Sequence, residues 1–219
     1  MTNISWTDAD RFDKKASEWD ANALRAALAD AVSRAIIAHL PVGQPQNSLE
    51  FGCGTGLVTI RVAEHCAQVT AADSSREMLN VLNEKIDAGA IRNIKPTFID
   101  LSAPESVDEL GESFDFVFSS MTLHHIPDTA RFLRQLYAHM APGATISIAD
   151  LDQEDGFFHD DEAEKVHHGF DRNSLKEILE TTGFINAAFM TAHIIEKKNR
   201  EGRTGSYPVF LLTAVKPMS

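Results

Sequence analysis

Between residues 48 and 149 the chain alternates short apolar runs with amphipathic stretches, and this alternation limits the fold more than any other feature. Strands are predicted near 48–51, 68–72, 95–99, 114–119 and 144–149, and helices near 57–66, 75–88, 104–110 and 129–140. Such a pattern specifies a parallel sheet with helices on both faces, and ligands bind beyond the carboxyl ends of its strands. We therefore expect the functional residues in the loops that follow the strands.

The flanking segments extend this layout. They are predicted to hold an amphipathic helix at 20–40, a helix at 172–182, strands at 184–195 and 208–215, and a polar turn at 197–206. Two long strands joined by a turn that contains glycine form a hairpin. The fold class is therefore α/β, a three-layer, doubly wound and mostly parallel seven-stranded sheet with an antiparallel C-terminal strand.

Composition excludes several classes of function. The formal charge of −12 argues against binding a nucleic-acid backbone, which needs clustered Lys and Arg. No run approaches the roughly 18 apolar residues of a membrane span, and the first residues lack a basic and then apolar signal region. Cys53 and Cys66 are too few for a disulfide framework. We expect a soluble cytoplasmic protein with reduced cysteines, binding neither membrane nor nucleic acid.

A glycine-rich turn, Leu49-Glu-Phe-Gly-Cys-Gly-Thr-Gly56, follows the first predicted strand. Glycine there lets the backbone pass close to a nucleotide-like ligand. The dinucleotide fingerprint would place a further glycine where Leu57 stands, so the match to NAD-binding proteins is imperfect. Asp73 follows the second strand, where an acid can accept hydrogen bonds from both ribose hydroxyls of NAD or of S-adenosylmethionine. Taken alone, the glycines also fit a purely structural turn.

Over residues 10 to 215, and most specifically 48 to 150, the chain resembles class I S-adenosylmethionine-dependent methyltransferases of the small-molecule type. The segments similar to their motifs are 49–56, 72–79, 98–101, 114–128 and 141–148. The resemblance implies a Rossmann-like fold, S-adenosylmethionine as cofactor and S-adenosylhomocysteine as product. It divides a single domain into N-terminal lid helices (1–45), a cofactor-binding core (46–152), a substrate-lid insert (153–170) and a C-terminal helix and hairpin (171–219).

The resemblance also implies a cofactor site at the strand ends. The methionine part would be held by Glu50, Gly52, Cys53, Gly54 and Gly56. The nucleoside would contact Asp73, Ser74, Met78, Asp100 and Leu101. Ser119 would close the floor of the site, and Trp19 would be the lid. Plain alternatives remain open, since Met78 fits an apolar core, Asp100 a helix cap and Trp19 simple packing. The sulfonium and ammonium groups of the cofactor favour acidic residues electrostatically.

Two groups of residues are candidates for acceptor binding and chemistry. His124 and His125 follow the fourth strand, where one of them would act as a base if the acceptor is a hydroxyl, although loop structuring is the simpler interpretation. The insert carries residues expected to cover the acceptor: Phe157, Phe158, His159, His168 and Phe170. A merely solvated acidic loop remains the alternative there. No metal site is predicted, because the histidine spacing matches no recognised ligand motif.

The function predicted from these features is transfer of a methyl group from S-adenosylmethionine to a small molecule by a monomer or homodimer. A non-catalytic regulatory or scaffold subunit with the same fold is one alternative. An NAD-dependent oxidoreductase is another, disfavoured by Leu57 and by the Asp100 segment. The sequence does not choose among oxygen, nitrogen, carbon and sulfur as the acceptor atom.

Overall fold

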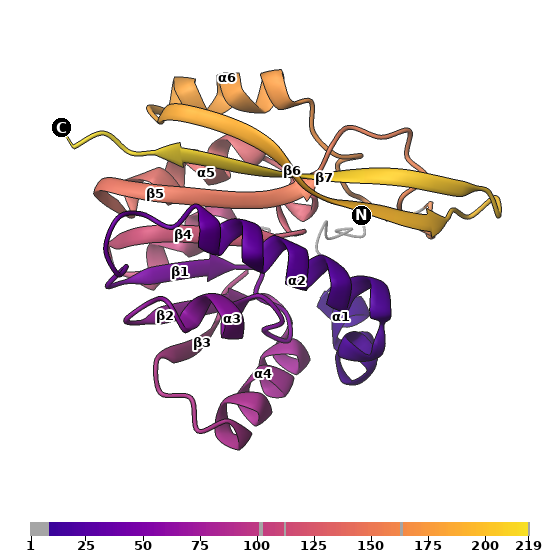
Figure 1. Cartoon of the computed structure of the whole chain (residues 1–219), viewed down its shortest axis with the longest axis horizontal. Helices are drawn as coiled ribbons and strands as arrows, with labels where there is room; N and C mark the ends of the chain where they lie inside the picture. Colours follow the sequence, from indigo (N-terminus) through magenta and orange to yellow (C-terminus); the bar gives the residue numbers. More distant parts are fainter. Residues whose placement is uncertain (1–8, 101–102, 112, 163, 219) are drawn as a thin grey trace, which may run out of the picture.

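The computed structural model describes residues 9–100, 103–111, 113–162 and 164–218. Its centre is a seven-stranded sheet in the order β3-β2-β1-β4-β5-β7-β6 (Figure 1). The strands are β1 Ser48–Phe51, β2 Val69–Asp73, β3 Ile94–Phe98, β4 Phe114–Ser120, β5 Met140–Leu151, β6 Ile185–Lys198 and β7 Thr204–Val215. The helices are α1 Ala9–Lys15, α2 Ala23–Ala38, α3 Thr59–Ala63, α4 Arg76–Ala88, α5 Thr129–Ala138 and α6 Arg172–Thr182. Three 3₁₀ segments complete the described elements: η1 Ala16–Ala21, η2 Pro104–Leu110 and η3 Leu123–His125.

The direction of the strands confirms the predicted fold class. The first five strands pair in parallel, while β7 is antiparallel to both of its neighbours, β5 and β6. The main difference lies in β5, which begins at Met140 rather than near residue 144. Met140 pairs with Phe114 before a register shift, so the segment containing Pro142 and Gly143 joins the strand instead of preceding it.

Helices cover both faces of the sheet, as a buried parallel sheet requires. On one face α2, α3 and α4 bury Val32, Val62 and Leu82 against the strands. On the other, α5 and α6 bury Phe132 and Leu179. Figure 1 shows α2 crossing in front of the sheet and α5 behind it. All residues of β1 and β2 are buried, which explains why both strands read as short apolar runs.

Side-chain caps begin the helices beside the strand-end loops. Asn22 accepts from the backbone N–H of Leu24 at 3.0 Å, where α2 begins. Ser75 accepts from Met78 N–H at 3.1 Å, so α4 starts three residues after the end of β2. Such caps satisfy backbone groups that a helix start leaves without partners. They fix the loops that carry the candidate site.

The N-terminal elements α1 and η1 close over these loops. The carboxylate of Asp13 accepts from Ser75 Oγ at 2.5 Å, and that of Asp20 accepts from Thr55 Oγ1 at 2.6 Å. Asp20 also forms an ion pair with Lys85 of α4. Within the described ranges no helix has the length and apolar character needed to cross a membrane.

Candidate functional site

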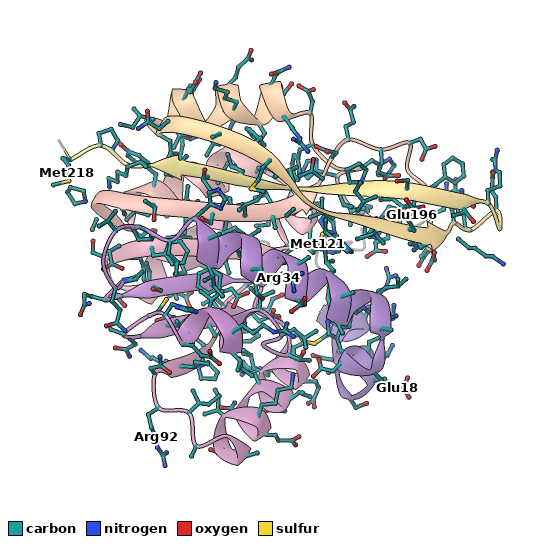
Figure 2. The ribbon with its side chains drawn as sticks, viewed as in Figure 1. Glu18, Arg34, Arg92, Met121, Glu196 and Met218 are labelled. Carbon is teal, nitrogen blue, oxygen red and sulfur yellow. The ribbon has the colours of Figure 1, made fainter. Side chains whose placement is uncertain are left out.

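A cavity of about 720 Å³ lies at the carboxyl ends of β1, β2 and β4. The N-terminal elements and the start of α2 form one wall, and the insert and the end of β6 form another. Figure 2 labels two of its lining residues, Met121 after β4 and Glu196 on β6. Met121 has a φ of 56°, a strained conformation of the kind that clusters at functional sites. The cavity therefore lies at the sheet edge where the sequence predicts ligand binding.

Glycine is required where the first loop forms the floor of this cavity. Gly52 has a φ of +69°, and a Cβ atom there would collide with the side chain of Thr122. Thr122 Oγ1 donates to the carbonyl oxygen of Gly52 at 3.2 Å. Gly54 has a φ of +53° with open space beside it, and its N–H donates to Asp73 Oδ2 at 2.7 Å. A bound molecule can thus approach the bare backbone at Gly54.

Two buried carboxyl groups stand over this floor. Glu50 is 1% exposed and accepts a hydrogen bond from the hydroxyl of Thr59. Burial raises the pKa of Glu50 well above its ordinary value, and the charge of Asp73 raises it further. Burial also raises the pKa of Asp73, although N–H groups of Gly54 and Ser75 lower it in part. Buried acids of this kind are stabilised by a cation or by additional hydrogen-bond donors. A sulfonium, an ammonium group and ribose hydroxyls supply both, so the residues present fit S-adenosylmethionine.

The structure brings most of the predicted cofactor residues to the cavity wall. Those that line it are Trp19, Glu50, Gly52, Cys53, Gly54, Asp73, Ser74 and Met78. Cys53 is buried, and burial with the neighbouring charges of Asp73 and Glu50 raises the pKa of its thiol well above the ordinary value.

Three other predicted residues do not line the cavity. Gly56 allows close packing against Leu82 of α4, where a Cβ atom would collide. Asp100 is exposed beyond β3, and its carbonyl oxygen accepts from Ser106 Oγ at 2.5 Å. Ser119 is fully buried and donates to the carbonyl oxygen of Phe51 at 2.8 Å, which ties β4 to β1. The predicted contact of Leu101 lies outside the described residues.

Three histidines gather in the part of the cavity away from the glycine loop. The ring centroids of His124 and His125 are 4.2 Å apart, and that of His159 lies 5.2 Å from His124. His124 Nδ1 is 2.6 Å from Asp150 Oδ1, with both side chains buried. Asp150 also accepts from the backbone N–H of His124 at 3.1 Å. An ionised Asp150 holds the proton on Nδ1 and leaves Nε2 as the basic nitrogen.

The two remaining histidines are held differently. His159 Nδ1 is 3.0 Å from Glu164 Oε2, whereas its buried Nε2 has no hydrogen-bond partner within the described ranges. Burial lowers the pKa of His125 well below its ordinary value, and the charges of His124, His159 and Arg11 lower it further. His125 is therefore neutral at pH 7. In the described part of the chain no group of three or more His, Cys, Asp or Glu side chains is arranged to hold a metal ion.

Of the five residues expected in the substrate lid, only Phe158 and His159 line the cavity. Phe157 lies under the guanidinium of Arg200, 4.4 Å from its carbon to the ring centroid. His168 is exposed beside Gly156, and the backbone of Phe170 pairs with Leu151 and Gln153. These three side chains are placed outside the cavity because the insert folds back along the end of β5.

Basic residues of the terminal hairpin hold the insert in place. Lys197 Nζ donates to the carbonyl oxygen of Phe158 at 2.7 Å and lies 3.0 Å from Asp160 Oδ1. Arg200 donates to the carbonyl oxygen of Gly156 at 2.6 Å. The basic turn, which alone would read as a solvated surface, is therefore a structural support for the cavity wall.

Several cavity residues were missed at the level of sequence: Arg11, Lys15, Arg25, Thr122, Glu164 and Lys198. Asp150, which orients His124, carried one usable signal, because it stands near the carboxyl end of a predicted parallel strand. The basic residues carried none, since isolated Arg and Lys on helices are ordinary surface residues. Only the folding of α1, α2 and β6 around the cavity brings them together.

Fold and site together define a class of protein: a doubly wound sheet with a cavity at a glycine loop and two strand-end acids, the place where sheets of this kind bind nucleoside-containing ligands. Comparisons identify the class more closely. Residues 19–188 match a family described as a methyltransferase domain. The chain therefore belongs to this family of methyltransferases.

Individual relatives are more distant. An uncharacterized methyltransferase of Schizosaccharomyces pombe is 32% identical over 162 residues, 68% of this chain and 55% of that protein. Trans-aconitate 2-methyltransferase of Deinococcus radiodurans is 31% identical over 120 residues, 54% of this chain and 43% of that protein. The chain thus spans about half the length of these curated relatives. The solved complex of DhpI with S-adenosylhomocysteine has a TM-score of 0.71 and 21% identity, covering 95% of this chain and 94% of that one.

Proposed function

We propose that this methyltransferase acts on a small molecule that is enclosed between its N-terminal elements and the 153–170 insert. The observation that carries the proposal is a single cavity, which runs from the glycine loop to the three histidines. A cavity of about 720 Å³ is within the range of small-molecule sites. The name of the Deinococcus radiodurans relative, which gives trans-aconitate as its acceptor, supports the same size class.

In this proposal the glycine-loop end holds the methyl donor. Glu50 and the backbone of Gly52 and Gly54 face its methionine part, Asp73 its ribose, and Ser74 and Met78 its adenine. Trp19 closes over it as part of the N-terminal lid. Bound there, S-adenosylmethionine supplies a methyl group activated by its sulfonium. The protein's main task is then to place the acceptor atom in line with that methyl group, since positioning alone supplies several kcal/mol.

His124 is the proposed base for an acceptor that loses a proton. Its Nε2 would take the proton of a hydroxyl or amine while the acceptor's lone pair forms the new bond to the methyl carbon. The electron pair of the broken carbon–sulfur bond stays on sulfur, so charges balance. Asp150 would orient the ring and stabilise the imidazolium that forms. His125, kept neutral by burial, would shape the wall beside it.

Cofactor binding tests the first half of the proposal. We expect S-adenosylhomocysteine to raise the melting temperature of the chain and NAD to leave it unchanged, because Leu57 stands where a dinucleotide site needs glycine. Stabilisation by NAD alone would contradict the proposal.

Transfer of a labelled methyl group tests the second half. The chain, labelled S-adenosylmethionine and a metabolite extract should yield a labelled small molecule that mass spectrometry identifies. Tight cofactor binding with no labelled product, from extracts of several sources, would instead favour the regulatory or scaffold subunit.

A further inference from the structure

Several cations line the cavity of a protein whose net charge is −12. The lining residues there include three cations from the N-terminal elements, Arg11, Lys15 and Arg25, which we call the cation cluster. Burial lowers the pKa of Lys15, and the charges of Arg11 and Arg25 lower it further, so the three lie within electrostatic reach of one another. Glu164 and Asp160 of the insert act on Lys15 in the opposite sense and raise its pKa, so the described chain supplies counter-charge as well.

The protein supplies only part of that counter-charge. Glu164 forms an ion pair with Arg11, and Lys197 on the opposite wall pairs with Asp160. Within the described ranges neither Lys15 nor Arg25 has a carboxylate within ion-pair distance, and burial lowers the pKa of Arg25. Two cations of the cavity wall therefore lack a partner from the described chain.

Arg25 is also held in a fixed orientation. Its guanidinium carbon lies 3.7 Å from the centroid of the Trp19 ring, a cation–π contact that uses one face of the group. The edge of the guanidinium keeps its N–H donors, which match the two oxygens of a carboxylate or phosphate. Trp19 is held in turn by an edge contact with Phe12, at 5.8 Å between ring centroids.

A second observation, in the insert, points to a ligand. His159 Nε2 is buried and unpartnered, while Nδ1 of the same ring is 3.0 Å from Glu164, the partner of Arg11. A buried polar atom without a partner is costly, so its retention suggests a donor that arrives with a ligand. Glu164 contacts both His159 Nδ1 and Arg11, so it links the His159 ring to the cation cluster.

We infer that the methyl acceptor is a small anion whose carboxylate or phosphate group binds between Arg25 and Lys15, with its donor groups toward His159 and His124. This inference rests on the proposed function. The methyl donor brings one carboxylate into the cavity together with its own ammonium and sulfonium groups, so it adds no net negative charge beside Lys15 and Arg25. An anionic acceptor supplies the remaining counter-charge.

Anion binding is measured on the whole chain saturated with S-adenosylhomocysteine, so that the cofactor's carboxylate already occupies its place. Inorganic phosphate and citrate, titrated at constant ionic strength, should each raise the melting temperature, whereas chloride should not. Arg25→Gln and Lys15→Gln should each weaken the binding of these anions by about tenfold or more, as expected for the loss of one charged hydrogen bond. Arg25→Lys keeps the charge and should weaken anion binding less. It also keeps the inference testable if Arg25→Gln does not fold.

Matched controls remove the same charge elsewhere. Arg34→Gln removes a charge on the same helix as Arg25, at an exposed position labelled in Figure 2. Lys14→Gln removes the charge next to Lys15, and both of these lysines are exposed. Neither residue lines the cavity, so both variants should bind phosphate and citrate as the parent chain does.

The outcomes separate the inference from the proposed function. Stabilisation by S-adenosylhomocysteine without any by phosphate or citrate would overturn the anionic acceptor and leave the methyltransferase intact. Loss of S-adenosylhomocysteine affinity in Arg25→Gln and Lys15→Gln, with anion binding unchanged, would assign these residues to the cofactor and also overturn it. Failure of S-adenosylhomocysteine to bind the parent chain would overturn the proposed function itself.

Fractionation of acceptors gives a direct test. A metabolite extract is separated on an anion exchanger, and each fraction is assayed for labelled methyl transfer. The inference requires acceptor activity in the retained fraction, and activity only in the flow-through contradicts it. Phosphatase treatment of the retained fraction then distinguishes the two chemistries, since a phosphate monoester loses acceptor activity and a carboxylate keeps it.

Discussion

We propose that Asp73 combines a structural and a binding role in one carboxylate. It accepts from Gly54 N–H at 2.7 Å and from Ser75 N–H at 2.8 Å while it lines the cavity. Asp73→Ala should weaken S-adenosylhomocysteine binding by about 1–3 kcal/mol and lower the free energy of unfolding by a similar amount, because two N–H groups lose their partner. Asp73→Asn keeps one acceptor oxygen and should lose less of both. Titration calorimetry and urea denaturation measure the two effects, and unchanged affinity in Asp73→Ala would remove this residue from the site.

Substitution of Asp150 tests whether His124 acts as a base and leaves the histidine itself in place. Asp150→Asn should leave S-adenosylhomocysteine affinity unchanged and lower kcat by about 10²-fold, since His124 loses the group that fixes its Nδ1 proton. Asp152→Asn is the matched control, because Asp152 stands two residues further along and pairs with Arg172 at 2.6 Å outside the cavity. Both variants are assayed with the acceptor found by labelling. Equal activity in the two would show that His124 is not a base.

Polar contacts join the N-terminal elements to the loops around the cavity. Asp20, which accepts from Thr55 and pairs with Lys85, is the main anchor of η1. Asp20→Asn keeps the hydrogen bond and loses the ion pair, so S-adenosylhomocysteine affinity should fall by about 0.2–1 kcal/mol. Limited proteolysis should then cut near residue 20 faster, and the cofactor should slow the cut. Asp30→Asn, which removes the exposed pair with Arg34, should change neither quantity.

Local patterns were enough to predict the elements themselves. The helix α6 has the predicted bounds of 172–182 because Asp171 caps its start and Gly183, with a φ of +114°, ends it. Strand β5 was predicted too short because Pro142 and Gly143 read as a turn, whereas pairing with Phe114 of β4 recruits the segment. The residues around Pro142 do not indicate by themselves that they pair with a strand elsewhere in the chain. For the same reason Ser119 was placed in the cofactor site, while the fold uses its hydroxyl to tie two strands together.

Over the whole molecule, the residues of the proposed cofactor half could be identified from the sequence, and those of the proposed acceptor half could not. The glycine loop and Asp73 belong to one strand–loop–helix unit, so their positions follow from local chain geometry and a family resemblance. The acceptor half is assembled from α1, α2, the 153–170 insert and the end of β6, which are far apart in sequence. Its cation cluster and its bonds from Lys197 and Arg200 to the insert exist only once the sheet has formed. Residues that recognise the acceptor therefore follow from the fold, and not from any motif.

Unfolding of the whole chain should report the buried histidine through its dependence on pH. The pKa of His125 in the folded chain lies well below its ordinary value of 6.5, because burial and neighbouring positive charge oppose protonation. Above about pH 6.5 both folded and unfolded chains carry a neutral imidazole, so His125 adds no pH dependence there. Below it the unfolded chain binds a proton that the folded chain does not, and the free energy of unfolding falls by up to about 1.4 kcal/mol per pH unit.

Glu50 and Asp73 have the opposite effect on how the free energy of unfolding depends on pH. Their pKa values are raised, so the folded chain takes up protons first as the pH falls, and stability increases. The contribution of His125 is isolated by comparing the parent chain with His125→Gln in urea at pH 7.5, 6.5 and 5.5, since the acids are common to both. The parent chain should lose stability relative to the variant as the pH falls through this range. A constant difference between the two would mean that His125 protonates equally in the folded and unfolded chains, and that the cavity around the three histidines is open to water.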